Sequence, residues 1–130
     1  MLEKLGIFRM AHGLAAHASA RQSEIARNVA NADTPQYRAR DIASFAESFD
    51  AGQATSAMRA TRPKHLDFET DTSTRYRSMP VAAEASPNGN TVSLETEMMK
   101  ATEVRHQHDL ALSVYSSSLN ILRTSLGRGR

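Results

Sequence analysis

The chain has 130 residues, of which 40% are hydrophobic and only 5% aromatic, with no tryptophan, no cysteine and a formal net charge of +2. This length allows one domain or one domain with an extension, and because much of the apolar content is alanine we expect a thin core and a marginally stable monomer. The missing cysteines exclude disulfides, thiolate nucleophiles and zinc–thiolate sites, and the mild charge without a run of like charges argues against nucleic-acid binding.

Residues 2–31 are predicted to form a long first helix. Apolar side chains recur at helical spacing and form a seam along this helix, namely Ile7, Ala11, Leu14, Ala18, Ile25 and Val29. Arg21 occupies the one position of this seam where an apolar side chain is missing. The opening residues lack the apolar run of a secretory signal peptide, so we expect no cleaved signal.

A polar corner is predicted where this helix ends. Asn28 and Asn31 lie three residues apart, which places both side-chain amides on one face at the helix end. Pro35 disfavours helical backbone at Thr34 and therefore ends the helix. The chain then turns and continues through Tyr37 and two arginines as an outward-going segment.

The middle of the chain is predicted to be largely irregular. Asp41 suits the N-cap of a short helix that would place Ile42, Phe45 and Phe49 on one face. Weak alternation over residues 65–69 and 75–79 is compatible with short strands, and Pro-Asn-Gly-Asn at residues 87–90 is a strong turn signal.

The last third of the chain carries the most regular pattern. Mainly apolar positions recur at alternating spacings of four and three residues. This gives an average repeat of 3.5 residues, which is typical of a coiled-coil seam. Its members are Leu94, Met98, Ala101, Arg105, His108, Leu112, Tyr115, Leu119, Leu122 and Leu126. With Ser93 as N-cap and Gly127 as C-terminal stop, the pattern predicts one helix of about 33 residues and about 50 Å.

These patterns predict a mainly α fold in which long N- and C-terminal helices pair as a coiled coil. We divide the chain into an N-terminal helix (1–34), an irregular middle segment (35–90) with a short helix and short strands, and a C-terminal helix (91–130), together one domain. A seam of this length needs another long helix, either in the same chain or in a neighbouring copy. No apolar stretch approaches the roughly 20 residues that span a membrane.

No catalytic, cofactor-binding or metal-binding constellation is recognisable, so we expect no enzyme, no cofactor and no small-molecule ligand. His106 and His108 are two residues apart and point to different sides of a helix, so they cannot share a metal. Arg105 and His108 interrupt the apolar seam, where such polar residues can set the register. For His108 the alternatives are a pH-sensitive position or simply a hydrogen-bonded interface residue. Glu95 and Glu97 are interpreted as solvated charges favoured at a helix start.

Residues 26–41, ARNVANADTPQYRARD, resemble the N-terminal signature of the flagellar axial proteins, the family of rod, hook and hook-associated subunits. The positions that carry the resemblance are Asn28, Asn31, Asp33, Thr34, Pro35, Tyr37 and Asp41. A second stretch looks most like the proximal rod members of this family and consists of Gly89, Asn90, Thr91 and Val92, followed by Glu97 and Met98. The family usually has glycine after the proline, where this chain has Gln36, so either a type I turn or a strained residue is expected there.

The resemblance implies a structural subunit of the proximal rod of the bacterial flagellar basal body, located in the periplasm and exported without a cleaved signal peptide. It implies helical self-assembly into a hollow, torque-transmitting shaft through the terminal helices. Other rod proteins would lie above it, and a FliE-like adaptor to the membrane ring and the flagellar type III export gate below it. The alternative hypothesis is a soluble coiled-coil adaptor or regulator that acts as a dimer.

Overall fold

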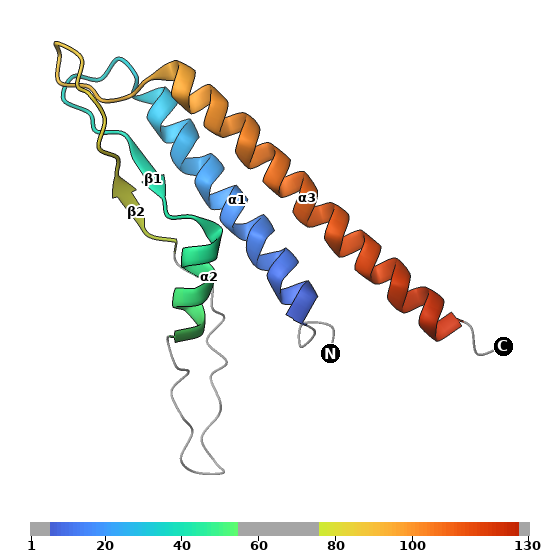
Figure 1. The fold of residues 1–130 in the computed structure, drawn as a ribbon. Coiled ribbons are helices and arrows are strands. Elements are labelled where there is room, and N and C mark those ends of the chain that lie inside the picture. The colour runs from blue at the N-terminus through green and yellow to red at the C-terminus, as the bar shows by residue number, and fades with distance from the viewer. Residues whose placement is uncertain (1–5, 55–75, 128–130) are drawn as a thin grey trace, which may run out of the picture.

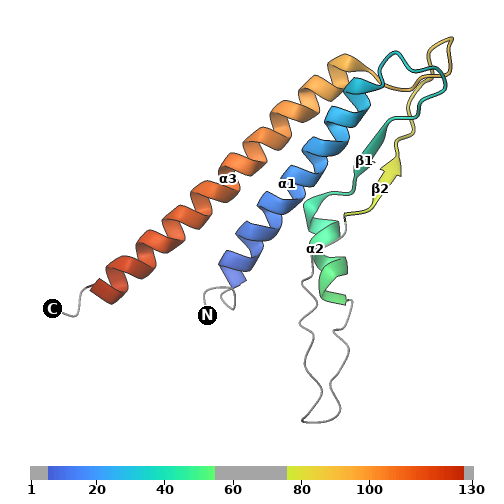
Figure 2. The same cartoon turned by 180° about the vertical axis from the view of Figure 1, so that it is seen from behind.

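The computed structural model describes residues 6–54 and 76–127, and there the chain is mainly helical. The elements in chain order are α1 (Gly6–Ala30), β1 (Arg40–Ile42), α2 (Phe45–Ala54), β2 (Ser78–Pro80) and α3 (Leu94–Gly127). The two long helices lie side by side (Figure 1), as the view from behind also shows (Figure 2). The predicted fold class is therefore confirmed. No helix within the described ranges combines the length and apolar content needed to cross a membrane.

Small side chains fill the interface between α1 and α3. Ala18, Ile25 and Val104 form its buried centre, with Ala101 packed against them. Small residues at the contact let two helices approach closely, but each buries little apolar area, so the pairing itself contributes limited hydrophobic stabilisation. Of the seam predicted on the first helix, Ile25 and the two alanines at positions 11 and 18 are buried as expected.

The start of α1 differs from the predicted seam. Ile7 is half exposed and its neighbour Phe8 is buried instead. The Phe8 ring packs edge to face with Tyr115 of α3 at a centroid distance of 5.2 Å. Such aromatic pairs add to the stabilisation that burial gives, which explains why the larger ring takes the interface position.

The inward face of α3 is rotated from the predicted seam. The buried residues recur every seven positions and are Glu97, Val104, Ala111 and Ser118. One row of the predicted seam lies beside them, with Ala101, His108 and Leu122 partly buried, whereas Leu94, Met98, Leu112 and Leu126 are 51%, 70%, 52% and 82% exposed. These four do not close the interface within one chain, because smaller side chains occupy that place. A role for them between copies stays a prediction.

The two strands form a short antiparallel hairpin on the side of α1 that faces away from α3 (Figures 1 and 2). Asp41 pairs with Met79 at the centre of the register. Ser78 of β2 donates through its hydroxyl to a carboxylate oxygen of Glu24 at 3.1 Å, which fastens the hairpin to α1. The weak pattern at residues 75–79 thus partly corresponds to β2, while the possible strand at 65–69 lies outside the described residues.

The cap of α2 was predicted one turn too early. Asp41 belongs to β1, and α2 begins after Ser44. The Ser44 hydroxyl accepts from the Glu47 amide at 3.4 Å, and the Ser44 amide donates to the Glu47 carboxylate at 3.2 Å, which is a capping box. Phe45 and Phe49 share a face, as predicted, with ring centroids 5.4 Å apart.

The boundaries of α3 agree with the prediction. The hydroxyl of Ser93 lies 3.5 Å from the Thr96 amide at the helix start, and Gly127 is the last helical residue. The turn predicted at residues 87–90 is also present, with Gly89 at a φ of 80°. In this conformation glycine avoids the clash that a side chain would bring.

Candidate functional site: a polar corner between three segments

The corner is the region where the end of α1, residues 31–42, residues 86–93 and the first turn of α3 meet. At its centre the side chain of Asn28 is completely buried. Its Nδ2 donates to the Arg40 carbonyl at 2.7 Å and to Oε2 of Glu97 at 3.0 Å. Its Oδ1 accepts from the Arg40 amide at 3.1 Å and from the Tyr37 hydroxyl at 3.4 Å. One amide therefore ties α1 both to the strand segment and to α3.

Asn90 closes the carboxyl end of α1 from a distant part of the chain. Its Nδ2 lies 2.7–3.0 Å from three carbonyl oxygens, those of Asn31, Ala32 and Thr34. Its Oδ1 accepts from the Val92 amide at 2.7 Å. The three carbonyls belong to the turn that follows α1, and those of Asn31 and Thr34 also accept from the Thr34 and Tyr37 amides, so the Asn90 side chain fixes this turn as an additional donor.

Thr91 and Asn31 complete the hydrogen bonding of the corner. The Thr91 hydroxyl accepts from the Ala39 amide at 2.8 Å, and the Thr91 amide donates to the Tyr37 carbonyl at 3.0 Å. Asn31 acts locally, since its Nδ2 donates to the Arg27 carbonyl at 2.8 Å and its Oδ1 accepts from a threonine hydroxyl within the turn. Burying polar backbone groups costs little when each finds such a partner.

A cluster of charged residues extends the corner along the helices. Arg21 of α1 holds Asp41 of β1 with two hydrogen bonds, of 2.9 Å and 3.1 Å. Lys100 of α3 lies 3.3 Å from Asp41 and 3.0 Å from Glu97, and Arg21 also approaches Glu103 at 3.8 Å. The cluster thus joins α1, β1 and α3 by charge, as Asn28 joins them by its amide.

The charges around Asp41 set its protonation. Burial alone raises the pKa of this carboxyl group, because desolvation disfavours the charged form. Hydrogen bonds from Arg21 and from the Ile42 amide, together with the charges of Arg21 and Lys100, act in the opposite direction and leave the pKa below its usual value. The hydrogen bond to Asp41 in turn raises the pKa of Arg21.

Gln36 occupies a strained turn at the outer end of the corner. The Tyr37 amide donates to the Thr34 carbonyl at 3.3 Å, with Pro35 as the second residue of the turn and Gln36 as the third. Gln36 has a φ of 60°, the left-handed conformation that a type II turn requires at this position. Of the two expectations for this residue the strained one applies, and the turn keeps the geometry that glycine would favour.

The structure brings most of the predicted signature together. The residues that meet in the hydrogen-bonded corner are Asn28, Asn31, Thr34, Tyr37, Asp41, Asn90, Thr91 and Val92, with Gly89 packed beside Gln36. Asp33 and Pro35 are exposed on its surface. The seam residues of the terminal helices, through which the resemblance implies assembly, are spread along α1 and α3. Ile25 is buried. Four others are half-buried, namely Leu14, His108, Leu119 and Leu122, and the more exposed ones are Ile7, Leu94, Met98, Arg105, Leu112 and Tyr115.

Two members of the corner were not anticipated in their actual roles. Glu97 is 2% exposed and paired, so its interpretation as a solvated charge at the helix start is wrong. Its position in line with Val104 and Ala111 on one heptad row is the sequence signal that predicts an inward-facing side chain. Arg21, noted only as a gap in the seam, is the partner of Asp41.

The chemistry available to the corner is that of a structural joint. Its carboxylates at Asp41 and Glu97 are held by cations, and the amides of Asn28 and Asn90 are bonded to backbone. Within residues 6–54 and 76–127 no three metal-ligating side chains gather into a possible ion site. The arrangement fixes the directions of α1, α3 and the hairpin.

Comparison with known proteins identifies relatives along most of the chain. It is 34% identical over 119 residues to the flagellar basal body rod protein FlgB of Agrobacterium fabrum, which covers 89% of each chain. It is 30% identical over 115 residues to FlgB of Bacillus subtilis and 32% identical over 116 residues to FlgB of Escherichia coli, with 87% and 84% of each chain covered. No family model matches the chain.

Replacing Asn28 with alanine is expected to lower the free energy of unfolding by about 3 kcal/mol, because it leaves the backbone amide and carbonyl of Arg40 and a buried carboxylate oxygen of Glu97 without their partner. Asn31→Ala is the matched control. Its partners are exposed, so we expect a loss of about 1 kcal/mol or less. Urea unfolding followed by circular dichroism measures both, and equal losses would contradict the central role of Asn28.

Acid is expected to weaken the corner through Asp41. A carboxyl group whose pKa is lowered in the folded state stabilises the fold above its unfolded-state pKa of about 4, and this stability is lost as the pH falls through the lowered value. The urea concentration at which half of the protein is unfolded should therefore decrease as the pH is lowered below about 4. The urea midpoint of the Asp41→Asn variant should decrease less over the same pH interval. A variant whose midpoint decreases as much as that of the wild type would refute this assignment.

Gln36→Gly is expected to raise the free energy of unfolding by about 1 kcal/mol, because it relieves the left-handed backbone strain of the native residue. Gln36→Ala keeps the strain and serves as control, with little expected change. Thermal unfolding of the three proteins side by side gives the comparison. A variant with glycine that melts no higher than the one with alanine would show that the turn stores no strain.

Proposed function

The chain belongs to the FlgB family of flagellar basal body rod proteins and is a structural subunit of that rod, and we propose that it builds the rod by helical polymerisation through its terminal helices. The observation that carries the proposal is the outer surface of α3. Seven large apolar side chains on this helix are at least half exposed within one chain, namely Leu94, Met98, Met99, Leu110, Leu112, Ile121 and Leu126. Four of them, Leu94, Met98, Leu112 and Leu126, follow the spacing of one helix face, and exposed apolar side chains aligned in this way mark an interaction site.

The thin core supports the same proposal. The buried centre between α1 and α3 consists of Ala18, Ile25 and Val104 with Ala101 beside them, so one copy alone buries few large apolar side chains there. Contacts with neighbouring copies would supply the missing burial and stabilise the fold by mass action. A subunit of low intrinsic stability also suits export in an unfolded state through a narrow channel.

We propose further that the rod stands in the periplasm and that the subunit reaches it through the flagellar type III export gate without a cleaved signal. Its neighbours would be other rod proteins above and an adaptor to the membrane ring, together with the export gate, below. A purely structural role, without catalysis, agrees with the paired carboxylates and bonded amides of the corner.

The relatives are rod proteins, so the hypothesis of a soluble dimeric adaptor loses its support. The two functions also differ in what they require of α3. A dimer needs one apolar stripe, whereas a helical polymer needs at least two different contact surfaces on each subunit. The partly buried row beside the inner face and the exposed row outside it give α3 two such surfaces.

Leu112→Asp is expected to abolish incorporation into the basal body and swimming while the purified chain keeps its helix content. Leu112 is 52% exposed within one chain, so a charge there costs the monomer little, but it would be desolvated without a partner in the assembly. The measurement is the amount of the protein in purified basal bodies, detected with antibodies against the purified chain, in cells that lack the native copy.

Ser113→Asp is the control. Ser113 is an exposed polar residue next to Leu112 on the same helix, so a similar charge there tests whether any exposed aspartate at this level of α3 prevents assembly. Wild-type protein that is absent from the basal bodies of flagellated cells would refute the rod function. Normal assembly of Leu112→Asp would refute only the role of this stripe.

A further inference from the structure

A groove of about 570 Å³ lies between α1 and α3, and no hairpin residue lines it. Its floor is made of small side chains, among them Ala18 and Ala101. Ser19 forms part of its α1 side, and Arg105 and His108 form part of its α3 side. The groove therefore combines an apolar floor of low relief with a basic edge.

The guanidinium of Arg105 takes part in none of the ion pairs formed among the described residues. It is exposed, while Arg21 and Lys100, on the flank of the helix pair that carries the hairpin, are committed to Asp41. An unpaired arginine beside an apolar groove favours an occupant that brings both an apolar side chain and a carboxylate.

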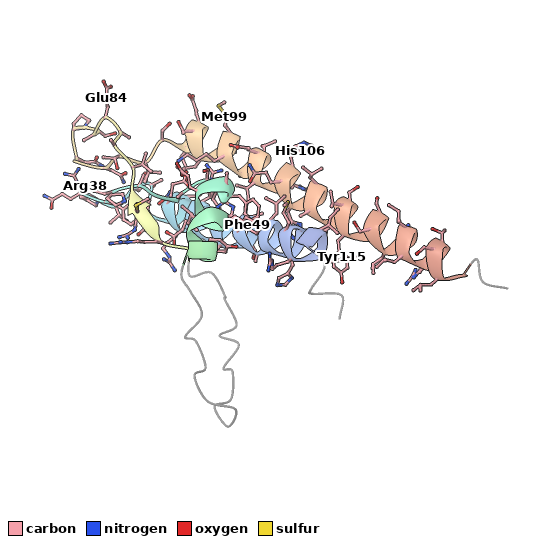
Figure 3. The ribbon with its side chains drawn as sticks, turned by 60° about the horizontal axis from the view of Figure 1, so that its bottom comes forward. Arg38, Phe49, Glu84, Met99, His106 and Tyr115 are labelled. Atoms are coloured by element: carbon pink, nitrogen blue, oxygen red, sulfur yellow. The ribbon has the colours of Figure 1, made fainter. Side chains whose placement is uncertain are left out.

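The first turns of α3 carry both of these groups on their outer surface. Met98 and Met99 are 70% and 75% exposed, and Met99 points away from α1 in Figure 3, whereas Tyr115 lies toward it. Glu95 is exposed one turn earlier and is likewise absent from the ion pairs of the described residues. Methionine side chains are unbranched and flexible, so they fit irregular grooves well.

We propose that the groove binds the outer face of α3 of a second copy, with Met98 and Met99 of that copy over the alanine floor and its Glu95 against Arg105. The inference rests on the proposed function, because it describes how copies meet within the rod. Glu95 and Arg105 are ten residues apart on one helix, so successive copies would be displaced by about 15 Å along the helix axis. The two surfaces differ, so the contact is heterologous, and with this displacement it repeats as an open helix instead of closing into a dimer.

Disulfide cross-linking tests the contact directly, because the chain has no cysteine of its own. In the proposed arrangement Met99 of one copy lies near the level of Ser19 of the next. The variant with both Ser19→Cys and Met99→Cys should give a ladder of cross-linked multimers after oxidation, both in basal bodies and in the concentrated full chain. The single-cysteine variants should give no ladder, and neither should the control that pairs Ser19→Cys with Ser125→Cys.

Charge reversal supplies a second readout. Glu95→Arg and Arg105→Glu should each lower swimming and the cross-linking yield at least tenfold, and the combination of both should restore them. Glu84→Arg changes the charge of an exposed acidic residue in the loop between β2 and α3, which lines no part of the groove (Figure 3), and should leave both unchanged. Circular dichroism of each purified variant checks that α3 still forms.

The outcomes separate this contact from the proposed function. Protein present in basal bodies but without the multimer ladder in either preparation would overturn the contact and leave the rod function intact. A single cross-linked band at the mass of another protein would also overturn it, because the occupant would then not be a second copy. A ladder from the purified chain, combined with absence of the protein from basal bodies, would support the contact and refute the rod function.

Discussion

The fold depends on one buried amide. Asn28 lies near the end of α1, where its side chain binds the backbone of β1 and the carboxylate of Glu97 on α3. No apolar side chain can replace it, because the groups that it joins are all polar and would be left unsatisfied in the interior. The directions of three segments thus follow from the donor and acceptor geometry of a single residue.

This polar joint matters because the apolar contact between the helices is weak. An interface centred on two alanines, one valine and one isoleucine brings α1 and α3 close together but specifies their register poorly, since neighbouring small residues are nearly equivalent. The Asn28–Glu97 bond and the Arg21–Asp41–Lys100 ion pairs do specify it, because their atoms match in one register alone. Because small and polar residues hold α1 and α3 together, the larger apolar residues of α3 stay exposed and available for contacts outside the chain.

The sequence was sufficient to predict the features that depend on local chemistry. The Ser93 cap, the Gly127 end and the turn at Gly89 each rest on the backbone preferences of one or two residues. The α3 seam was harder, because a 3.5-residue pattern weighted by side-chain size selects the leucines, whereas close packing selects Val104 and Ala111 one position away. The Asp41 cap failed for a related reason, since the carboxylate has a stronger partner in Arg21, twenty residues earlier.

The mismatch between the predicted and the actual inner row carries functional information. A long helix that satisfied one partner would bury its largest apolar side chains against that partner, because they contribute most to stability. α3 instead turns Ala111 and Ser118 toward α1 and leaves Leu112 and Met98 half or more exposed. The exposed periodicity of the larger residues is what the proposed contacts between copies require, while the smaller inner row serves the pairing of α1 and α3 within one copy.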